Sequence, residues 1–578
     1  MKDWKGSGVA ENKSFRVDFA GLRTGGPYRV EMRIRQGRRT LERLAIKDVF
    51  VGDVWMLGGQ SNMEGIGNLA DAPQPHPQVR AFFMRDEWGL AEEKLHYLSE
   101  AVDRVHNSYG DEPGRPPKEL LEKGRKALVK GMSPGLVFGI ELYRRTRVPQ
   151  GLVPCAHGGT SMAQWSPSLR DKGGDSLYGA MMRRYEKLGQ PIAGILWYQG
   201  ESDANREAAS CYTRNMVDLV SSVRRDMGLP GLPWLMVQLG CHAATEDDWS
   251  WNNIQEQQRR LPEAIGNLDV APAIDLDLDD GIHIGGRAHH VLGRRLARLA
   301  DRMVCGDRGV KPGIVLKNME MVRTPSCFAG APCMSLKLTY GNVAGRLQSP
   351  GRPSGFVLLD PRGRNVQGIY KTTLSGNHAV LHTNMQRRQL EALSVSYGHG
   401  RFPYCNITDR DGMSIPCMQA APVPVDKTLA PDCREWQTAF LRGVRSISGA
   451  SYVVAANAGG WRKAPPRDPF GVLPKPAAMK RVGVYAMRTI LTAREPLDAL
   501  LILGANAPFK MWVNGRAVLA DPSAGVPIDP DRYKVGLRLE EGRNELLVAF
   551  APPGPGAHLG VCARIGTPQG KSDGRITV

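Results

Sequence analysis

The chain contains the residue types that an acyl-transfer reaction requires. Ser61 lies in the run Gly58-Gly59-Gln60-Ser61-Asn62-Met63, and His283 follows Asp280 by three residues. Acyl transfer needs a nucleophilic hydroxyl, a base within hydrogen-bond reach, and a group that holds the base in the right tautomer. We therefore expect Ser61 as the nucleophile, His283 as its base and Asp280 as the carboxylate that orients the base.

The oxyanion that develops in such a reaction needs hydrogen-bond donors. The glycine pair before Ser61 lets the backbone turn sharply, which can aim the Ser61 amide at that oxygen. Gly159, in His157-Gly158-Gly159-Thr160-Ser161, can bring its N–H close to a substrate because it has no side chain. The carboxamide of Gln199, in Gln199-Gly200-Glu201-Ser202, is the third candidate donor.

Some roles around this set stay open between neighbouring residues. Asp279 directly precedes Asp280, and Glu201 could also orient His283 if its loop bends that way. Asn62 and His157 could contact the substrate or support the residues that do. Trp165 could stack on a sugar ring or lie in the core, because aromatic side chains do both.

The elements that must position these residues alternate between short apolar runs and longer amphipathic stretches from about residue 49 to 305. This alternation is typical of βαβ units and a parallel sheet. The runs that predict strands are 53–57, 151–156, 193–198, 233–239 and 270–276, and the stretches that predict helices are 118–147, 178–188, 206–227, 252–261 and 287–303. Ligands of open parallel sheets bind beyond the carboxyl ends of the strands. Because four polar segments follow strands of this set, we expect them to meet at one edge.

The flanking regions have β patterns. Alternating runs at 15–19 and 28–32, on either side of Gly25-Gly26-Pro27, predict a small β element that packs with the later β region. Beyond residue 309 only short alternating runs occur, and Asn514-Gly515 predicts a hairpin with a type I′ turn near the end. The expected domains are N-terminal strands over 1–48, an α/β domain over 49–308, a β-rich accessory domain over 309–425, and a β-sandwich that could bind carbohydrate over 426–578.

At these residues the sequence resembles the sialate O-acetylesterase and acetylxylan esterase branch of the SGNH hydrolases. The run from Val51-Gly52-Asp53-Val54-Trp55 to Gly59-Gln60-Ser61-Asn62-Met63 is similar to the nucleophile block of that family. Trp197-Tyr198-Gln199-Gly200-Glu201-Ser202 is similar to its third block, and Asp280 with His283 to its DxxH block. The resemblance is strong over 49–305 and weaker to Pro422, and the last part of the chain resembles only galactose-binding-like β-sandwiches. Gln199 departs from the general SGNH pattern, which has asparagine there.

The resemblance implies a three-layer α/β/α fold, no metal or other cofactor, and hydrolysis of O-acetyl esters on a sialic acid or another acetylated glycan through an acetyl-Ser61 intermediate. Acetylxylan or another polysaccharide is the alternative substrate. Family resemblance also implies a place outside the cytoplasm, although no signal peptide is visible in the sequence.

Composition argues against several other classes. With 578 residues the chain should form about three domains, since single cores stop growing near roughly 250–300 residues. No apolar run reaches the roughly 18–20 residues that cross a bilayer, so we expect no membrane span. The net charge of +18 comes from basic residues spread over separate segments, which disfavours a specific nucleic-acid partner. The absence of an HExxH motif argues against a metal-dependent deacetylase.

Two further points stay open. Five of the ten cysteines, at 327, 333, 405, 417 and 433, gather in one region, where disulfides are an open possibility. A rival function of another class is a carbohydrate-binding protein in which the esterase domain is inactive. The presence of Ser61, His283 and Asp280 together argues against that rival.

Overall fold

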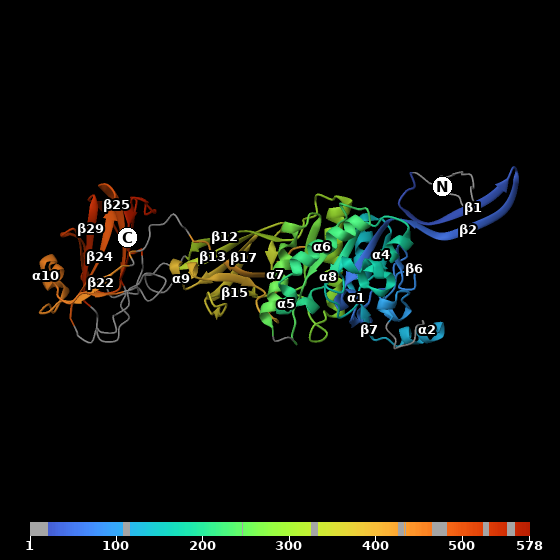
Figure 1. Ribbon diagram of the computed structural model, residues 1–578, viewed down its shortest axis with the longest axis horizontal. Coiled ribbons are helices and arrows are strands. Elements are labelled where there is room, and N and C mark those ends of the chain that lie inside the picture. The colour runs from blue at the N-terminus through green and yellow to red at the C-terminus, as the bar shows by residue number, and fades with distance from the viewer. Residues whose placement is uncertain are drawn as a thin grey trace.

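The structure is a computed structural model that describes residues 21–107, 116–244, 247–324, 333–425, 433, 435–464, 483–523, 531–551 and 561–578 (Figure 1). Its central sheet has seven strands in the order β11-β10-β9-β3-β8-β5-β6. Neighbouring strands are parallel throughout, except that β6 pairs antiparallel with β5 at the edge. The strands are β3 (Asp53–Gly59), β5 (Val79–Phe82), β6 (Trp88–Leu90), β8 (Gln150–Pro154), β9 (Gly194–Tyr198), β10 (Trp234–Gln238) and β11 (Leu268–Pro272).

Helices cover the sheet and complete the predicted α/β fold. They are α1 (Ser61–Glu64), α2 (Lys118–Lys126), α3 (Pro134–Thr146), α4 (Leu177–Leu188), α5 (Arg206–Ala209), α6 (Tyr212–Asp226), α7 (Asp248–Ala264) and α8 (Gly286–Ala300). Smaller elements are β4 (Gly67–Asn68), β7 (Lys130–Met132), the 3-10 turns η1 (Leu69–Asp71), η2 (Leu98–Glu100), η3 (Arg104–His106), η4 (Pro167–Asp175) and η5 (Glu201–Asp203), and the π turn η6 (Asp301–Cys305). Helix α3 packs against α8, and α6 packs against α7.

Local sequence explains why these elements form where they do. All five residues of β9 are buried, which suits a parallel strand covered on both faces. Helix α3 begins after Ser133, whose side chain accepts from the N–H of Gly135, and has a proline at its first position. Helix α4 ends at Gly189, which has φ +63° and closes the helix in the left-handed region.

The five predicted strands and the predicted helical stretches are confirmed, with two differences. Two predicted stretches each form two helices: 118–147 forms α2 and α3, with β7 between them, and 206–227 forms α5 and α6. Strands β5 and β6 were not predicted, yet they extend the sheet beyond β8. They are only four and three residues long, so they carry too little of the period-two pattern to stand out among loops.

The β-rich region after residue 309 continues the core of the α/β region. Its two larger sheets have the orders β12-β13-β18-β17 and β16-β15-β19-β21. The elements are β12 (Val315–Arg323), β13 (Met334–Gly341), β14 (Leu347–Gln348), β15 (Phe356–Leu359), β16 (Asn365–Val366), β17 (Ile369–Ser375), β18 (His378–Thr383), α9 (Arg387–Glu391), β19 (Ser394–Tyr397), β20 (Thr408–Asp409) and β21 (Met418–Pro422). One hydrophobic cluster runs from Trp55 to Val423, and Arg298 of α8 pairs with the fully buried Asp409 at 2.8 Å. The expected boundary near 308 therefore does not separate two cores.

The N-terminal strands differ from the prediction in two ways. Strands β1 (Gly25–Gln36) and β2 (Arg39–Val51) form a two-stranded antiparallel sheet that turns between Gln36 and Arg39, whereas Gly25-Gly26-Pro27 lies at the start of β1. The predicted run 15–19 lies outside the described residues. The hairpin does not pack with the later β region as expected, because the α/β region lies between them (Figure 1). Its base instead contacts the segment around β5, where Gln78 Nε2 donates to Gly26 O at 3.1 Å.

The C-terminal region is a β-sandwich, as predicted. One sheet has the order β23-β22-β24-β29-β26-β27, with β31 beside β24, and the other has the order β28-β25-β30. The elements are β22 (Gln437–Phe440), η7 (Ile447–Gly449), α10 (Tyr452–Ala456), β23 (Arg462–Lys463), β24 (Tyr485–Ala493), β25 (Leu497–Ala505), β26 (Phe509–Val513), β27 (Arg516–Asp521), β28 (Tyr533–Leu539), β29 (Gly542–Phe550), β30 (Val561–Gly566) and β31 (Ile576–Thr577). Asn514 and Gly515 have φ +47° and +81°, as the predicted type I′ turn requires.

Two further expectations concern membranes and cysteines. Among the described helices, none combines the length and the apolar character needed to cross a membrane. Cys405 and Cys417 are buried free thiols, so neither takes part in a disulfide of the kind left open above. Cys327 lies outside the described residues.

Candidate active site

Ser61 is placed by a tight turn at the end of β3. Gly59 has φ +125°, and a Cβ atom there would lie 2.1 Å from the backbone oxygen of Tyr198, so only glycine fits. The N–H of Gln60 then donates to Tyr198 O at 2.9 Å, which joins the turn to the end of β9. Ser61 opens α1 with 9% of its surface exposed. The nucleophile candidate therefore sits on a rigid corner at the carboxyl edge of the sheet.

His283 and Asp280 reach Ser61 from the loop that follows β11. The Nε2 atom of His283 lies 3.0 Å from Ser61 Oγ, and Nδ1 lies 2.8 Å from Asp280 Oδ2. An ionised carboxylate can only accept, so Nδ1 carries the ring proton and Nε2 is left to accept from the Ser61 hydroxyl. The three predicted residues thus form a continuous chain of hydrogen bonds, the geometry that a general base and its nucleophile need.

Asp280 also shapes the loop that carries His283. Its Oδ1 accepts from the backbone N–H groups of Ile282 at 3.0 Å and of His283 at 2.8 Å. Partial burial alone would raise the pKa of Asp280, but these hydrogen bonds, together with that from the His283 side chain, hold the pKa well below its usual value. Asp280 is therefore a carboxylate at neutral pH and in mild acid.

The alternatives to Asp280 have other contacts. Asp279 Oδ2 accepts from the backbone N–H of Asn68 at 3.3 Å and of Gly286 at 3.2 Å. Glu201 accepts from Asn62 Nδ2 at 2.8 Å. Burial raises the pKa of Glu201, and the hydrogen bond from Asn62 opposes that rise. The geometry thus selects Asp280 as the partner of the imidazole among the three candidates.

Asn62 ties the two halves of the site together. Its Oδ1 accepts from the N–H of Ile284 at 3.0 Å, while Nδ2 donates to Glu201 and lies 3.4 Å from Ile282 O. The residues on both sides of His283 are thereby held by the residue that follows Ser61. Asn62 supports the histidine loop, which is one of the two roles that the sequence left open for it.

Glu64 is a buried residue of the site that the sequence analysis missed. Its Oε2 accepts from the N–H of Gly158 at 2.8 Å, and its Oε1 accepts from Lys94 Nζ at 2.9 Å. The side chains of Glu64 and Lys94 are 8% and 14% exposed. Its position three residues after Ser61 on one helical turn was the available signal, since such residues share a face. Glu64 fixes the glycine loop after β8 against α1.

This arrangement leaves Gly159 as the outer residue of the glycine loop. A Cβ atom on Gly158 would lie 3.4 Å from the Ser61 Cβ, so the loop passes directly beside the nucleophile. Gly159 has φ +68°, is exposed, and has no atom within 4 Å of its Cβ position. The peptide N–H of Gly159 thus remains a candidate oxyanion donor beside that of Ser61.

Gln199 does not join the site in the predicted way. Its side chain is fully buried, and its Nε2 donates to Thr160 O at 3.1 Å and to Asp203 Oδ2. Both hydrogens of the carboxamide are thereby used, so the side chain cannot donate to an oxyanion without rearrangement. Gln199 instead braces the loop after β8 against the loop after β9. The prediction of Gln199 as an oxyanion donor is therefore corrected.

His157 and Trp165 lie beside the site in different settings. His157 is partly buried, and its Nδ1 lies 3.1 Å from Nδ1 of the buried His106, with the two rings stacked. Burial lowers the pKa of His157, and the Glu64 charge opposes this. Trp165 is fully buried, its Nε1 donates to Thr160 Oγ1 at 3.0 Å, and its ring meets Trp197 edge to face. The Trp165 ring belongs to the core, which is the second of the two placements that the sequence left open.

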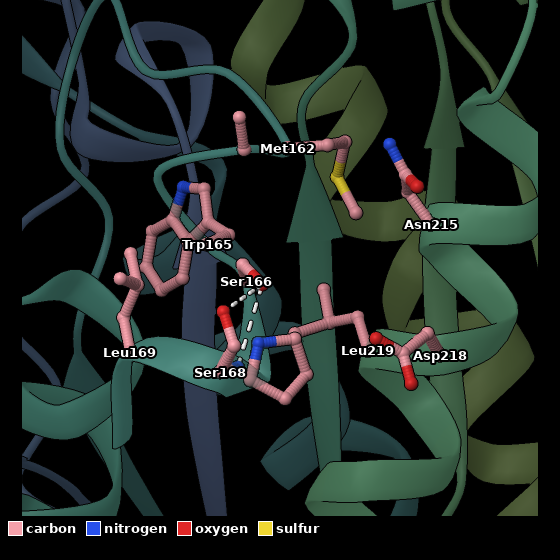
Figure 2. A pocket seen from close by; sticks show the side chains of 10 residues that line it. Met162, Trp165, Ser166, Ser168, Leu169, Asn215, Asp218 and Leu219 are labelled. Atoms are coloured by element: carbon pink, nitrogen blue, oxygen red, sulfur yellow. Dashed lines mark hydrogen bonds between the residues drawn. The ribbon is translucent and has the colours of Figure 1, made fainter. Parts of the chain in front are cut away.

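A pocket of about 310 Å³ lies beyond the glycine loop, between the segment 162–169 and α6. Figure 2 shows Asn215 and Asp218, from α6, lying across from Trp165 and Leu169. Its lining includes neither Ser61 nor His283, so the catalytic candidates lie outside it at the open edge of the sheet. Within the described part of the chain, no group of three or more His, Cys, Asp or Glu side chains could hold a metal ion.

The sequence of this chain is similar to those of known carbohydrate esterases. Residues 51–302 match the family described as carbohydrate esterase, sialic acid-specific acetylesterase. A probable carbohydrate esterase of Arabidopsis thaliana is 29% identical over 268 residues, which cover 42% of this chain and 88% of that protein. The sialate O-acetylesterase of Homo sapiens is 28% identical over 224 residues, which cover 34% of this chain but only 40% of that protein.

A solved structure extends the likeness beyond the α/β region. A carbohydrate acetylesterase from Xanthomonas citri has a TM-score of 0.51 and 22% sequence identity, and the match covers 72% of this chain and 93% of that chain. At this identity the likeness concerns the fold. The share covered exceeds the α/β region alone, in keeping with the continuous core that joins it to the β-rich region.

Proposed function

We propose that this chain is an ester hydrolase that removes O-acetyl groups from a glycan through an acetyl-Ser61 intermediate, because residues 51–302 match the carbohydrate esterase family. The observation that carries the proposal is the unbroken path from Ser61 Oγ to His283 Nε2, at 3.0 Å, and from His283 Nδ1 to Asp280, at 2.8 Å. This path can move the hydroxyl proton while keeping the resulting imidazolium beside a carboxylate.

In the proposed reaction, Ser61 Oγ attacks the acetyl carbonyl carbon as its proton moves to His283 Nε2. The carbonyl oxygen becomes an oxyanion that the N–H groups of Ser61 and Gly159 stabilise. His283 then gives the proton to the departing sugar oxygen, and the bond from carbon to that oxygen breaks. A water molecule then attacks the acetyl carbon of acetyl-Ser61 while His283 takes its proton. The bond from that carbon to Ser61 Oγ breaks, His283 returns the proton to Ser61 Oγ, and acetate leaves.

The substrate class we propose first is an O-acetylated sialic acid, free or within a glycan. The description of the matched family and the names of several relatives support this choice. Acetylxylan or another acetylated polysaccharide is the alternative substrate. Release of acetate from a panel of O-acetylated sialic acids, xylans and other glycans would separate these substrates. A place outside the cytoplasm stays a prediction from the family resemblance.

The first experiment measures hydrolysis of 4-nitrophenyl acetate by the full chain and by Ser61→Ala. We expect Ser61→Ala to lose activity down to the background, and brief exposure of the wild type to substrate should add the mass of one acetyl group to the peptide that contains Ser61. Ser210→Ala, which changes an exposed serine after α5, is the matched control and should keep full activity. Equal activity of wild type and Ser61→Ala would refute the proposal.

Treatment with a chelator tests the rival function of a metal-dependent deacetylase. The proposed steps use only Ser61, His283 and Asp280 for proton transfer, so we expect dialysis against EDTA to leave the rate unchanged. A rate that falls with EDTA and returns with added zinc would favour the rival. A wild type that hydrolyses no ester but binds glycans would favour the carbohydrate-binding function of the other class.

A further inference from the structure

Large aromatic side chains stand exposed on α7 and on the segment that follows β19. Trp249, near the start of α7, is 55% exposed, and Phe402 is 62% exposed. Tyr404, two residues further on, is 71% exposed. Exposed apolar groups that gather in one place often mark a binding surface, whereas single ones need no explanation.

The segments that carry these rings are joined to the histidine loop by backbone hydrogen bonds. The N–H of His242 donates to Arg401 O at 2.7 Å, and the N–H of Ala243 donates to Gly281 O at 2.7 Å. Gly281 lies two residues before His283. Phe402 is therefore connected to the base of the proposed reaction through one short loop.

Further contacts hold Trp249 and Phe402 near each other. Asp248 and Arg401, which directly precede them, form an ion pair at 3.9 Å. Asn252 of α7 donates to Gly400 O at 2.9 Å, and its Oδ1 accepts from the N–H of Gly400 at 2.8 Å. The two aromatic residues thus come from different regions of the chain, and each directly follows one partner of the same ion pair.

The loop after β9 also reaches this surface. The guanidinium carbon of Arg206, the first residue of α5, lies 5.4 Å from the centre of the Trp249 ring. Helices α5 and α7 contact each other on the side of the α/β region next to the β-rich region (Figure 1). Arg206 orients the tryptophan ring while more than half of the Trp249 surface stays open to solvent.

We propose that Trp249 and Phe402 form a stacking surface for the sugar next to the acetylated one, so that the enzyme acts on glycan chains in preference to free monosaccharides. This inference rests on the proposed esterase function. A sugar ring has apolar C–H faces and polar edges, which suits an aromatic ring beside the hydrogen-bond donors of arginine. The segment that carries Phe402 is joined by backbone hydrogen bonds to the loop that carries His283, as a subsite for a neighbouring sugar requires.

The β-rich region gains a functional role from this proposal. The segment that carries Phe402 follows β19, far in sequence from the Ser61 corner, yet it packs on the loop after β10. Substrate length would thus be selected by a region outside the α/β sheet. Removing the rings should affect binding of long substrates and leave the chemistry at Ser61 unchanged.

The test compares O-acetylated xylo-oligosaccharides with O-acetylated xylose, and O-acetylated mucin with free O-acetylated sialic acid. Each pair is measured by acetate release from the wild type, Trp249→Ala, Phe402→Ala and the double variant, with 4-nitrophenyl acetate as the small substrate. Tyr370→Ala is the matched control, since Tyr370 is 45% exposed but lies on β17. Aromatic contacts are worth about 0.5–1.5 kcal/mol, so each single variant should lower kcat/KM on chains about 2- to 10-fold, mainly through KM.

The outcomes separate the subsite from the esterase function. We expect the double variant to lose preference for chains while the monosaccharide and 4-nitrophenyl acetate rates stay at the wild-type level. The subsite proposal is overturned if the double variant still prefers chains, if all substrates slow equally, or if the wild type prefers monosaccharides. A wild type that cleaves 4-nitrophenyl acetate but no acetylated sugar overturns the carbohydrate part of the proposed function, and the subsite with it.

Discussion

Replacing Asp280 with asparagine tests the role of the carboxylate that holds His283. The asparagine oxygen can still accept from the N–H groups of Ile282 and His283, so the loop should keep its shape. The side chain loses its charge, however, and its amide group can no longer secure the Nδ1-protonated tautomer. We expect kcat for 4-nitrophenyl acetate to fall while KM changes little, because the imidazolium exists only during the reaction.

The size of the loss follows from the geometry of the pair. Two unit charges about 4 Å apart attract by about 1 kcal/mol in water and by about 4 kcal/mol near a protein surface. The Asp280 and His283 side chains are 36% and 21% exposed, which favours a value between these limits. About 2–3 kcal/mol corresponds to a fall in kcat of about 30- to 160-fold.

The assay uses initial rates of 4-nitrophenol release at neutral pH, with Ser61→Ala as the background. Asp279→Asn is the matched control, because Asp279 is the adjacent carboxylate but bonds Asn68 and Gly286 in place of the imidazole. Thermal unfolding of both variants checks that the loop remains folded. The reasoning is refuted if Asp280→Asn keeps the wild-type kcat, or if Asp279→Asn loses as much activity.

Three other predictions follow from the surroundings of the site. Glu64→Ala removes the buried carboxylate that accepts from the glycine loop, so kcat for 4-nitrophenyl acetate should fall by about tenfold or more. The fall should be smaller in Glu64→Gln, and an unchanged kcat in Glu64→Ala would contradict this role. Gly59→Ala places a Cβ atom 2.1 Å from Tyr198 O and should lower the free energy of unfolding by about 3 kcal/mol or more in denaturant titrations. The lowered pKa of Asp280 keeps its carboxylate charged in mild acid, so Asp280 should not steepen the acid limb of kcat/KM above about pH 4. A slope of two above about pH 4 would show that a second group titrates there.

The contrast between Gly59 and Gly159 shows how far sequence reasoning can go. Both were recognised as glycines of polar segments after strands. Only the coordinates show that Gly59 is required because Tyr198 O occupies its Cβ position, whereas the Cβ position of Gly159 is open. The first glycine serves the fold, and the second leaves room beside the nucleophile.

Gln199 and Trp165 do not take the catalytic or binding roles considered for them, and the physical reason is the same for both. Gln199 and Trp165 have the right chemical types for an oxyanion donor and a sugar platform, but both are fully buried and both side chains donate hydrogen bonds to Thr160. Burial and hydrogen-bond partners depend on contacts between segments far apart in the chain. Residue type and spacing carry no information about such contacts.

The sequence by itself determined the parallel sheet, its five longer strands and the residues that meet at its edge. The periodicity of each segment and the alternation of strands and helices along the chain can be read locally, and the carboxyl ends of parallel strands necessarily share one edge. The tertiary structure alone decided that Asp280 and not Asp279 or Glu201 holds His283, that Glu64 fixes the glycine loop, and that the β-rich region shares the core. These outcomes depend on which side chains are brought within about 3 Å of each other, a distance set by packing of the whole chain.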